Sequence, residues 1–288
     1  MDRPRRREFA VRKKVYRELS DKCTAAGLIP EVESDWKRCL LDWDEVPEPC
    51  DPGAHVPLDR GTRKRQQIEN MIQALRELAQ ELGIKGNGVL VDFCSGSGQL
   101  AFAAAWAMNS VWKEVVLVEK NPVHASRARI RARDSGLDRK VRVVEKSIEE
   151  FGEPFDVGSA VHACGSLSDI VLDKCIEKQA SFLLCPCCVG KISPSVRNCT
   201  YPRSTAFKTV LSEAEYLSVA KAGDFGESET ESGGPKRLCK SLIEWDRLLS
   251  VQEHGYRTRF LRMDPLSCSP KNDIILGTAD FTLTRMQL

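Results

Sequence analysis

The most regular pattern of apolar and polar positions begins at residue 66. Residues 66–83 place apolar side chains three and four positions apart, which predicts an amphipathic helix that ends at Gly83 and Gly86. Beyond it, short apolar runs alternate with helical stretches. The runs predict strands over 89–95, 115–120, 140–147, 155–165 and 180–188, and the stretches predict helices that include 121–136 and 167–179. This alternation predicts a parallel sheet covered on both faces.

The last third of the chain has a different pattern. Residues 207–222 and 236–253 predict two helices, and the polar, glycine-rich stretch between them predicts a loop. Residues 256–263 and 274–283 predict two strands, which are too close in sequence for a crossover helix and should form an antiparallel hairpin. The expected fold is therefore α/β and Rossmann-like. A mainly parallel sheet with an antiparallel C-terminal hairpin is the outline of a class I methyltransferase.

Composition narrows the class of protein without naming a partner. The 288 residues are 42% hydrophobic and 29% charged, which is ordinary for a globular domain and excludes global disorder. No apolar run approaches the roughly 20 residues that cross a membrane, and the first residues lack the apolar stretch of a secretory signal. Twelve cysteines in such a chain are expected to be thiols or metal ligands. We expect a cytoplasmic protein, with the nucleus as the alternative, and no membrane partner.

Charge is segregated near the N-terminus. Residues 1–17 hold eight Lys/Arg and two acids, a net +6, and residues 18–59 hold three and eleven, a net −8. Residues 60–65, RGTRKR, add +4. The pattern fits either a solvated extension or a basic arm that contacts phosphates. Because residues 46–57 contain four prolines, we interpret them as a linker. The predicted organisation is a charged extension and linker over 1–57 and a catalytic domain over 58–288.

The strongest chemical signal is the segment VLVDFCSGSGQLA. Gly96 and Gly98 let the backbone approach a ligand, and the next helix would point free N–H groups at it. The glycine spacing also fits a dinucleotide site. Asp92 distinguishes a dinucleotide site from a site for S-adenosylmethionine (SAM). Its carboxylate would repel the pyrophosphate of a dinucleotide but hold the cationic groups of SAM. We therefore predict a SAM site with Asp92, Cys94, Gly96 and Gly98, Asp92 and the glycines holding the methionine part.

The ends of the next two predicted strands extend this site. Glu119 ends the second strand, where an acid can accept hydrogen bonds from both ribose hydroxyls of a nucleoside cofactor. This role fits NAD and SAM equally. Ser147 and Ile148 follow the third strand, in the turn that flanks the adenine ring in a SAM site, although a plain strand-end turn is equally consistent with them.

The fourth and fifth strands end in His162-Ala163-Cys164-Gly165 and Cys185-Pro186-Cys187-Cys188. Ligands of an open α/β sheet lie beyond the carboxyl ends of its strands, so we predict His162, Cys164 and Cys187 as catalytic candidates. His162 could be a base, an orienting donor, a metal ligand or a packing residue. The cysteines could bind zinc, supply a nucleophile or remain structural thiols. We predict metal-free thiols that line or back the acceptor pocket.

Several motifs carry a family resemblance. VDFCSGSGQL, HACG, ASFLLCPCCVGK, YPRSTAF, the run from Cys239 to Arg247, EHGY and DPLSCSPKN resemble, in this order, the methyltransferase domain of the glutathione S-transferase C-terminal domain-containing protein family. The resemblance runs from about Leu58 to Gly277, and the N-terminal part departs from it. More distantly, HACG and the cysteine-rich strand are similar to segments of a tRNA 2′-O-methyltransferase whose zinc fingers this chain lacks. The Asn/Asp-Pro-Pro-aromatic run of many amine methyltransferases is also missing.

The resemblance implies SAM dependence and an RNA substrate. We therefore predict a SAM-dependent methyltransferase that acts on RNA, with tRNA as the preferred candidate and basic residues as its phosphate contacts. Two alternatives remain: a protein or small-molecule methyltransferase, and a non-catalytic scaffold that keeps the SAM fold. The acceptor atom and the oligomeric state are not determined by the sequence.

Overall fold

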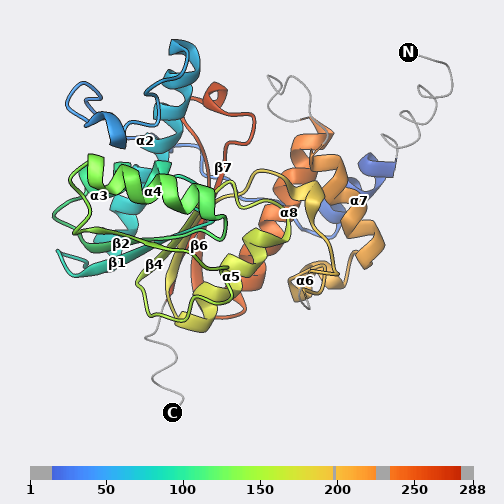
Figure 1. The fold of residues 1–288 in the computed structure, drawn as a ribbon. Coiled ribbons are helices and arrows are strands. Elements are labelled where there is room, and N and C mark those ends of the chain that lie inside the picture. Colours follow the sequence, from blue (N-terminus) through green and yellow to red (C-terminus); the bar gives the residue numbers. More distant parts are fainter. Residues whose placement is uncertain (1–14, 197–198, 225–233, 280–288) are drawn as a thin grey trace.

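A seven-stranded sheet forms the centre of the protein in the computed structural model, which describes residues 15–196, 199–224 and 234–279 (Figure 1). The strand order is β3-β2-β1-β4-β5-β7-β6. Neighbouring strands pair in parallel except at β7, which runs antiparallel between β5 and β6. The strands are β1 (Gly88–Phe93), β2 (Trp112–Val118), β3 (Val141–Val144), β4 (Val157–Val161), β5 (Ser181–Cys185), β6 (Tyr256–Arg262) and β7 (Asp273–Ala279). The predicted fold class is confirmed, including the C-terminal hairpin.

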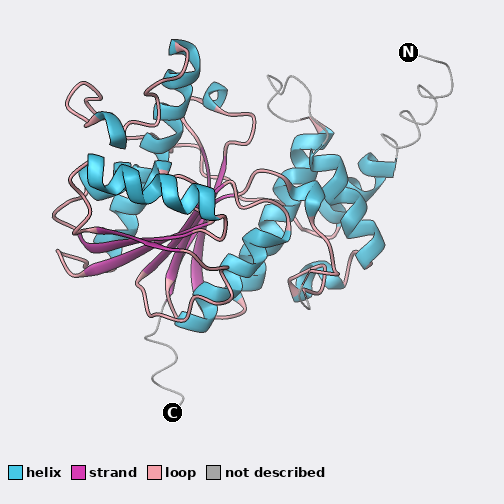
Figure 2. Cartoon of the chain, viewed as in Figure 1, coloured by secondary structure: helices cyan, strands magenta, loops and turns pink. Residues whose placement is uncertain are grey.

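Helices cover both faces of the sheet (Figure 2). They are α2 (Leu58–Glu81), α3 (Gln99–Ala107), α4 (Pro122–Asp134), α5 (Ser166–Lys178), α6 (Thr205–Lys208), α7 (Glu213–Asp224) and α8 (Pro235–Gln252), with short 3-10 turns η1 (Glu48–Cys50), η2 (Val189–Lys191) and η3 (Leu266–Cys268). No helix among the described residues is both long enough and apolar enough to span a membrane.

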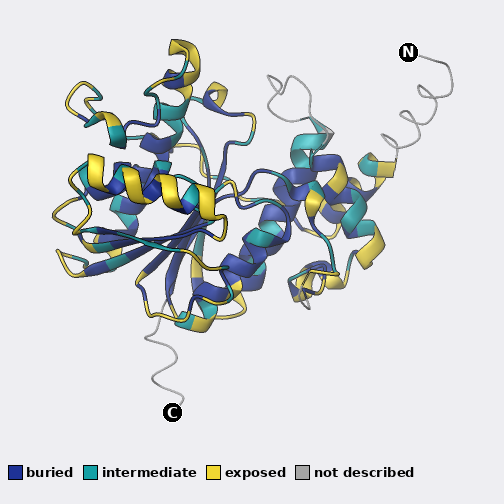
Figure 3. Cartoon of the chain, in the orientation of Figure 1, coloured by how far each residue is buried: buried dark blue, intermediate teal, exposed yellow. Residues whose placement is uncertain are grey.

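The strands are apolar on both sides because both sides are buried. Leu90 lies in one hydrophobic cluster with residues of α2, α3 and α4, and its neighbour Val91 lies in another with residues of α5 and α8. Successive side chains of a strand point to opposite faces. A continuous apolar run such as that of β1 therefore indicates a strand covered on both faces. Figure 3 shows the buried strands between partly exposed helices.

A third apolar cluster builds a helical lobe beside the sheet. Residues of α7 and α8 pack there with Leu19 and Cys23, which belong to a helix over residues 15–25. Lys22 and Glu215 join the two segments by an ion pair of 2.8 Å. Trp36 donates from its indole nitrogen to Asn70 of α2 at 2.8 Å. Residues 15–57 thus pack against the catalytic domain. The division of the chain at residue 58 stays a prediction.

All five predicted parallel strands end two to four residues earlier than expected, and the cause is clearest for the last two. The fourth stops at Val161 because His162 has a positive φ of 69°, which a strand does not accommodate. The fifth stops at Cys185 because Pro186 has no N–H to donate to a neighbouring strand. Both chemical motifs therefore lie in loops beyond the strands and not within them.

Two helix predictions also needed correction. The first helix begins at Leu58, just after Pro57, so that RGTRKR forms its first turns and does not precede it. The predicted helix over 207–222 is two helices, α6 and α7. Ser212 and Glu215 hydrogen bond to each other's backbone N–H, a capping box that starts a new helix at this point. Most of the predicted basic arm (1–14), the predicted loop at 225–233 and residues 280–288 lie outside the described residues.

Candidate functional site

A cavity of about 260 Å³ opens beyond the carboxyl ends of β1 and β4. It unites four of the predicted site residues, Asp92, Cys94, Gly96 and His162. The other lining residues are Lys64, Gln67, Ile68, Ser95, Ser97, Gln99, Leu100 and Val161. The sequence motifs identified the residues at the strand ends. Gln67 lies on α2, and no sequence motif marks it as a site residue. Lys64 belongs to the RGTRKR cluster, which we expected to border the cleft.

The backbone of the glycine loop explains its sequence. Cys94, Gly96 and Gly98 all have positive φ, of 52°, 56° and 82°. A Cβ on Gly98 would lie 2.4 Å from the Leu117 side chain, so the loop must pass this close to β2 without a side chain. At Gly96 no atom lies within 4 Å of an added Cβ, and the positive φ alone favours glycine there. Gly98 therefore shapes the loop from its core side and does not line the cavity.

Asp92 is buried at the base of the cavity, with 2% of its surface exposed. The Ser159 hydroxyl donates to the carboxylate at 3.2 Å, and the Ala101 N–H of α3 also donates to it. Burial raises the pKa of Asp92 to about 7, and the negative charge of Glu119 adds to the rise. Neither hydrogen-bond donor carries a positive charge. A cationic ligand would thus gain a carboxylate that the protein leaves uncompensated.

Glu119 connects the glycine loop to the end of β2. Its carboxylate accepts the Gly96 N–H at 2.9 Å and the Asn121 N–H at 2.8 Å. A carboxylate can accept about four hydrogen bonds, so two positions remain for ribose hydroxyls. In the same loop, the Ser95 hydroxyl is enclosed and has no partner among the described residues. Together with the buried Asp92, these unused acceptors and the unpaired hydroxyl fit the methionine and ribose parts of SAM.

The predicted adenine contacts lie outside this cavity. Ile148 is buried, 4% exposed, in the apolar cluster that contains Phe93 and Val118. The Ser147 N–H donates to Glu150 at 2.8 Å and closes the turn after β3. The roles of Ser147 and Ile148 in cofactor binding stay predictions.

The rim of the cavity carries positive charge. Lys64 and His162 both line it. Burial lowers the pKa of Lys64, and so do the positive charges of Arg60 and Arg131. Partial desolvation at the cleft and the charge of Lys64 lower the pKa of His162, which favours its neutral form. The cation of Lys64, whose pKa the nearby Arg60 and Arg131 lower, forms a favourable place for an anion.

The rest of the RGTRKR cluster is less available than its sequence indicates. Arg65 makes two hydrogen bonds to the buried carboxylate of Asp51, at 2.6 and 3.1 Å, and lies over the Trp43 ring. Arg63 pairs with Asp59 at 3.1 Å on the surface of α2. Arg65 therefore fixes the proline-rich segment to the domain. Replacing Arg65 would therefore disturb the folded structure and would not be a clean test of phosphate binding.

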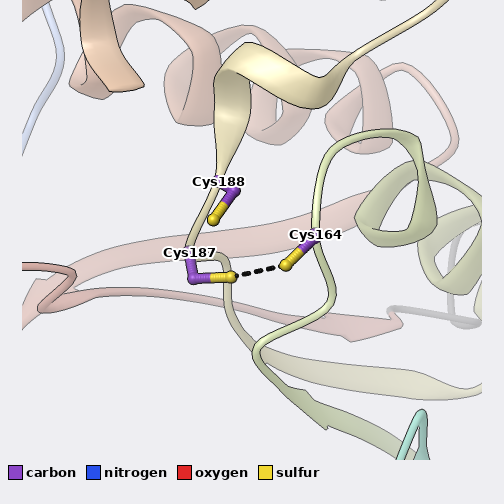
Figure 4. Close-up of side chains that lie close together, drawn as sticks. All are labelled: Cys164, Cys187 and Cys188. Carbon is purple, nitrogen blue, oxygen red and sulfur yellow. Dashed lines mark hydrogen bonds between the residues drawn. The ribbon is translucent and has the colours of Figure 1, made fainter. Parts of the chain in front are cut away.

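Cys164, Cys187 and Cys188 form a second cluster, beside the cavity (Figure 4). Their sulfur atoms all lie within 4.8 Å of one another, and Cys164 and Cys187 are 2.9 Å apart. Burial raises the pKa of Cys164 and of Cys187, which disfavours a free thiolate nucleophile. Cys185 is separate, since its thiol faces the Lys271 carbonyl at 3.5 Å. The catalytic roles of Cys164 and Cys187 stay predictions.

A buried ionic network underlies the loops that carry these cysteines. Arg247 of α8 makes two hydrogen bonds to Asp169 of α5, at 3.0 and 2.9 Å, and one to Glu244 at 2.9 Å. Glu244 contacts Lys240 at 3.4 Å, and Lys240 contacts Asp273 at 2.7 Å. Each of these side chains is at most 1% exposed. The charged residues Lys240, Glu244 and Arg247 of the Cys239–Arg247 motif thus form ion pairs in the interior of the protein.

The same network reaches the other motifs. The Tyr201 hydroxyl of YPRSTAF donates to Asp169 at 2.8 Å, and Arg247 donates to the Gly165 carbonyl of HACG at 2.9 Å. Gly165 has a positive φ of 57°, and a Cβ there would lie 2.5 Å from the Lys191 carbonyl oxygen. The final glycine of HACG is therefore needed for the close packing of this loop on η2.

Comparison with known proteins agrees with this geometry. Residues 63–195 match the model of a methyltransferase domain family. The chain is 33% identical over 253 residues to the glutathione S-transferase C-terminal domain-containing protein homolog of Drosophila melanogaster, covering 86% of this chain and 42% of that protein. It is 34% identical over 264 residues to the mouse protein (Mus musculus), covering 90% and 39%. The chain thus spans about two fifths of the length of these relatives.

Among solved structures, a SAM-dependent methyltransferase from Aquifex aeolicus is similar, with 15% identity, a TM-score of 0.44 and coverage of 84% of this chain and all of that one. Residues 63–195, which match the methyltransferase-domain model, contain the residues that line the cavity, the glycine loop and the cysteine-bearing strand ends. Residues 63–195 are therefore a methyltransferase domain, in a chain that is similar over most of its length to the glutathione S-transferase C-terminal domain-containing proteins.

Proposed function

We propose that the protein is a methyltransferase that transfers the methyl group of SAM to RNA, with tRNA as the substrate. The observation that carries the RNA assignment is the positive rim of the cofactor cavity. Lys64 lines the cavity, and Arg60 and Arg131 lower its pKa. A phosphate at this rim would offset the mutual repulsion of these cations.

A second basic surface supports the same substrate. Arg127, Arg129 and Arg133 are exposed along the outer side of α4 (Figure 3). Arg129 pairs with Glu145 at 3.0 Å across the surface. Arg131, from the same basic run, turns inward and donates to the Ser97 carbonyl of the glycine loop at 3.2 Å. The run therefore divides into surface groups that can contact a phosphate backbone and one group that supports the cofactor loop.

The preference for tRNA comes from the sequence. HACG and the cysteine-rich strand are similar to segments of a tRNA 2′-O-methyltransferase, and the structure brings both segments to the side of the cavity. Such an enzyme acts on an acceptor beyond the strand ends. The similarity therefore supports a structured RNA, and not a single-stranded one, as the substrate.

In this proposal, each of four groups at or near the cavity has a role. SAM supplies an electrophilic methyl group when bound. Asp92 and Glu119 would hold its methionine and ribose parts, so that catalysis rests mainly on positioning. The lowered pKa of His162 favours its neutral form, which can accept a proton from an acceptor hydroxyl at the rim. Lys64 would hold an adjacent phosphate.

The deciding experiment offers methyl-labelled SAM to the protein with separated RNA, protein and metabolite pools. We expect label in the RNA pool, concentrated in tRNA and lost with Asp92→Ala. Glu213→Ala is a suitable control, because Glu213 is exposed in α7, which belongs to the helical lobe beside the sheet.

Each other outcome selects one of the alternatives. Label confined to the protein or metabolite pool would replace RNA as the substrate. RNA binding and SAM binding without transfer to any pool would favour a scaffold. Label spread over all structured RNAs would retain RNA but reject tRNA.

A further inference from the structure

We propose that Cys164, Cys187 and Cys188 bind one zinc ion, with a fourth coordination position open to solvent. The three cysteines come from two loops that are far apart in sequence and meet beyond the ends of β4 and β5 (Figure 4). Among the described residues, no other group of His, Cys, Asp or Glu meets the geometric conditions for a metal site. The site is separate from the SAM cavity, and the proposal does not depend on the substrate.

The backbone directs neighbouring side chains toward one point. In an extended strand, Cys187 and Cys188 would point to opposite faces. Here the chain leaves the strand at Pro186, and Cys188 has φ −119° and ψ 86°. Both sulfur atoms consequently lie within 4.8 Å of the Cys164 sulfur, as Figure 4 shows. A metal ion explains this convergence, because each thiol then becomes a ligand.

The distances are compatible with zinc after a small adjustment. Zinc–sulfur bonds of about 2.3 Å in a tetrahedron separate the sulfur atoms by about 3.8 Å. The separation of 2.9 Å between Cys164 and Cys187 is shorter than this value, and no separation in the group exceeds 4.8 Å. Cys164 is half-buried in a loop, so a change of its rotamer can open the shorter distance.

The loops are held in register independently of any metal. The Gly165 N–H donates to the Cys188 carbonyl at 2.8 Å, which links the ligand Cys188 to the residue after the ligand Cys164. Arg247 holds the Gly165 carbonyl from the buried ionic network. Such support from a surrounding shell keeps ligands in place for a metal. Cys187 is buried, whereas Cys164 and Cys188 are half-exposed, so the cluster is open on one side.

Three protein ligands and one open position are typical of zinc sites that bind a further ligand. Thiolate ligands also select zinc over magnesium or calcium. The cluster lies close along the chain to the SAM cavity, because Cys164 is two residues beyond His162, which lines that cavity. A zinc ion here would join the loops after β4 and β5 at the acceptor side.

The test measures the metal directly. The full chain is purified without chelator and with a thiol reductant, and its zinc content is measured by mass spectrometry. We expect about one zinc per chain, near zero in Cys187→Ser and at least a twofold loss in Cys164→Ser and Cys188→Ser. Cys39→Ser is the matched control: its thiol donates to the Glu69 carbonyl at 3.2 Å, a bond that a hydroxyl can make.

Cobalt(II) reconstitution keeps the proposal falsifiable where a variant folds poorly. The wild-type protein should develop the thiolate-to-cobalt charge-transfer absorption of a tetrahedral site, and added zinc should remove it. A metal-free wild-type protein that also gives no such absorption would overturn the proposal. So would a stable disulfide between Cys164 and Cys187 under reducing conditions, detected by peptide mass. Zinc content is independent of methyl transfer, so failure of the RNA assignment would leave this result unchanged.

Discussion

Asp92 and Asp169 are both buried carboxylates, yet the protein treats them in opposite ways. Asp92 lies at the end of β1 and is 2% exposed, and Asp169 lies in α5 and is fully buried. Burial raises the pKa of Asp92 to about 7. Burial alone would also raise the pKa of Asp169, but the guanidinium of Arg247 holds it below its usual value. The difference is the presence of a cationic partner.

This comparison separates a ligand site from a structural one. Asp169 has its charge and hydrogen bonds satisfied by Arg247 and Tyr201, so it stabilises the junction of α5, α8 and the HACG loop. Asp92 is bonded to a hydroxyl and a backbone N–H, so its ionisation costs free energy until a cation arrives. A buried acid without a cation at the wall of a cavity therefore indicates where a positively charged cofactor binds.

The largest expected effect comes from breaking the structural pair. Arg247→Met leaves Asp169 buried without its cation and removes one of the two cations beside Glu244, which should lower the free energy of unfolding by about 3–5 kcal/mol. Denaturant unfolding measures this change. Arg142→Met is the control, because Arg142 is 41% exposed and pairs with acids at the surface, where the loss should stay within about 1 kcal/mol. Equal losses in the two variants would contradict the structural role of Arg247.

Removing the charge at Asp92 should have the opposite sign on stability. We expect Asp92→Asn to weaken SAM binding by about 1–3 kcal/mol, measured by calorimetry. Because the folded-state pKa is raised to about 7, the cost of ionising Asp92 in the SAM-free protein builds up as the pH rises from the ordinary pKa of an aspartate to about 7, and it is fully present above that pH. At pH 8 the variant should therefore be more stable than wild type by roughly 0.5–2 kcal/mol. Below the ordinary pKa of an aspartate this advantage should vanish, and a variant less stable at pH 8 would contradict the assignment.

The pH dependence of SAM binding gives a smaller and separate measure. A cationic ligand prefers ionised Asp92, so binding should release a proton and tighten as the pH rises through about 7. Affinity should change by up to about tenfold per pH unit below this value and level off above it. Asp92→Asn should flatten the profile between pH 6 and 8. A profile unchanged by the substitution would assign the titration to another group.

The smallest expected effect concerns the rim. Lys64→Gln should weaken RNA binding and lower the slope of log affinity against log salt by about 0.9, the share of one phosphate contact. SAM affinity should not fall, since the change removes a positive charge near a cationic cofactor. Lys85→Gln is the control, because Lys85 is exposed before β1, at the opposite end of the strand. Equal salt slopes for the two variants would remove Lys64 from the RNA surface.

The ionic network shows why some motif residues could not be interpreted from sequence. Glu244 and Arg247 are neighbours on α8, but Asp169 precedes Arg247 by 78 positions, and nothing in that spacing predicts that the two meet. Arg65 and Arg131 look like surface residues of basic runs, but each has a fixed partner in the fold. Charge runs predict a solvated face on average, and tertiary contacts decide which member turns inward.

The sequence by itself determined the fold class and the place of the cofactor site. Apolar runs that alternate with helices require a covered parallel sheet, and Asp92, the glycine loop and Glu119 lie at adjacent strand ends because of that topology. Only the tertiary structure decided that Cys164 meets Cys187 and Cys188 while Cys185 does not, and that α8 neutralises Asp169. Local patterns record burial and turn preferences, whereas convergence of loops depends on contacts between segments far apart in the chain.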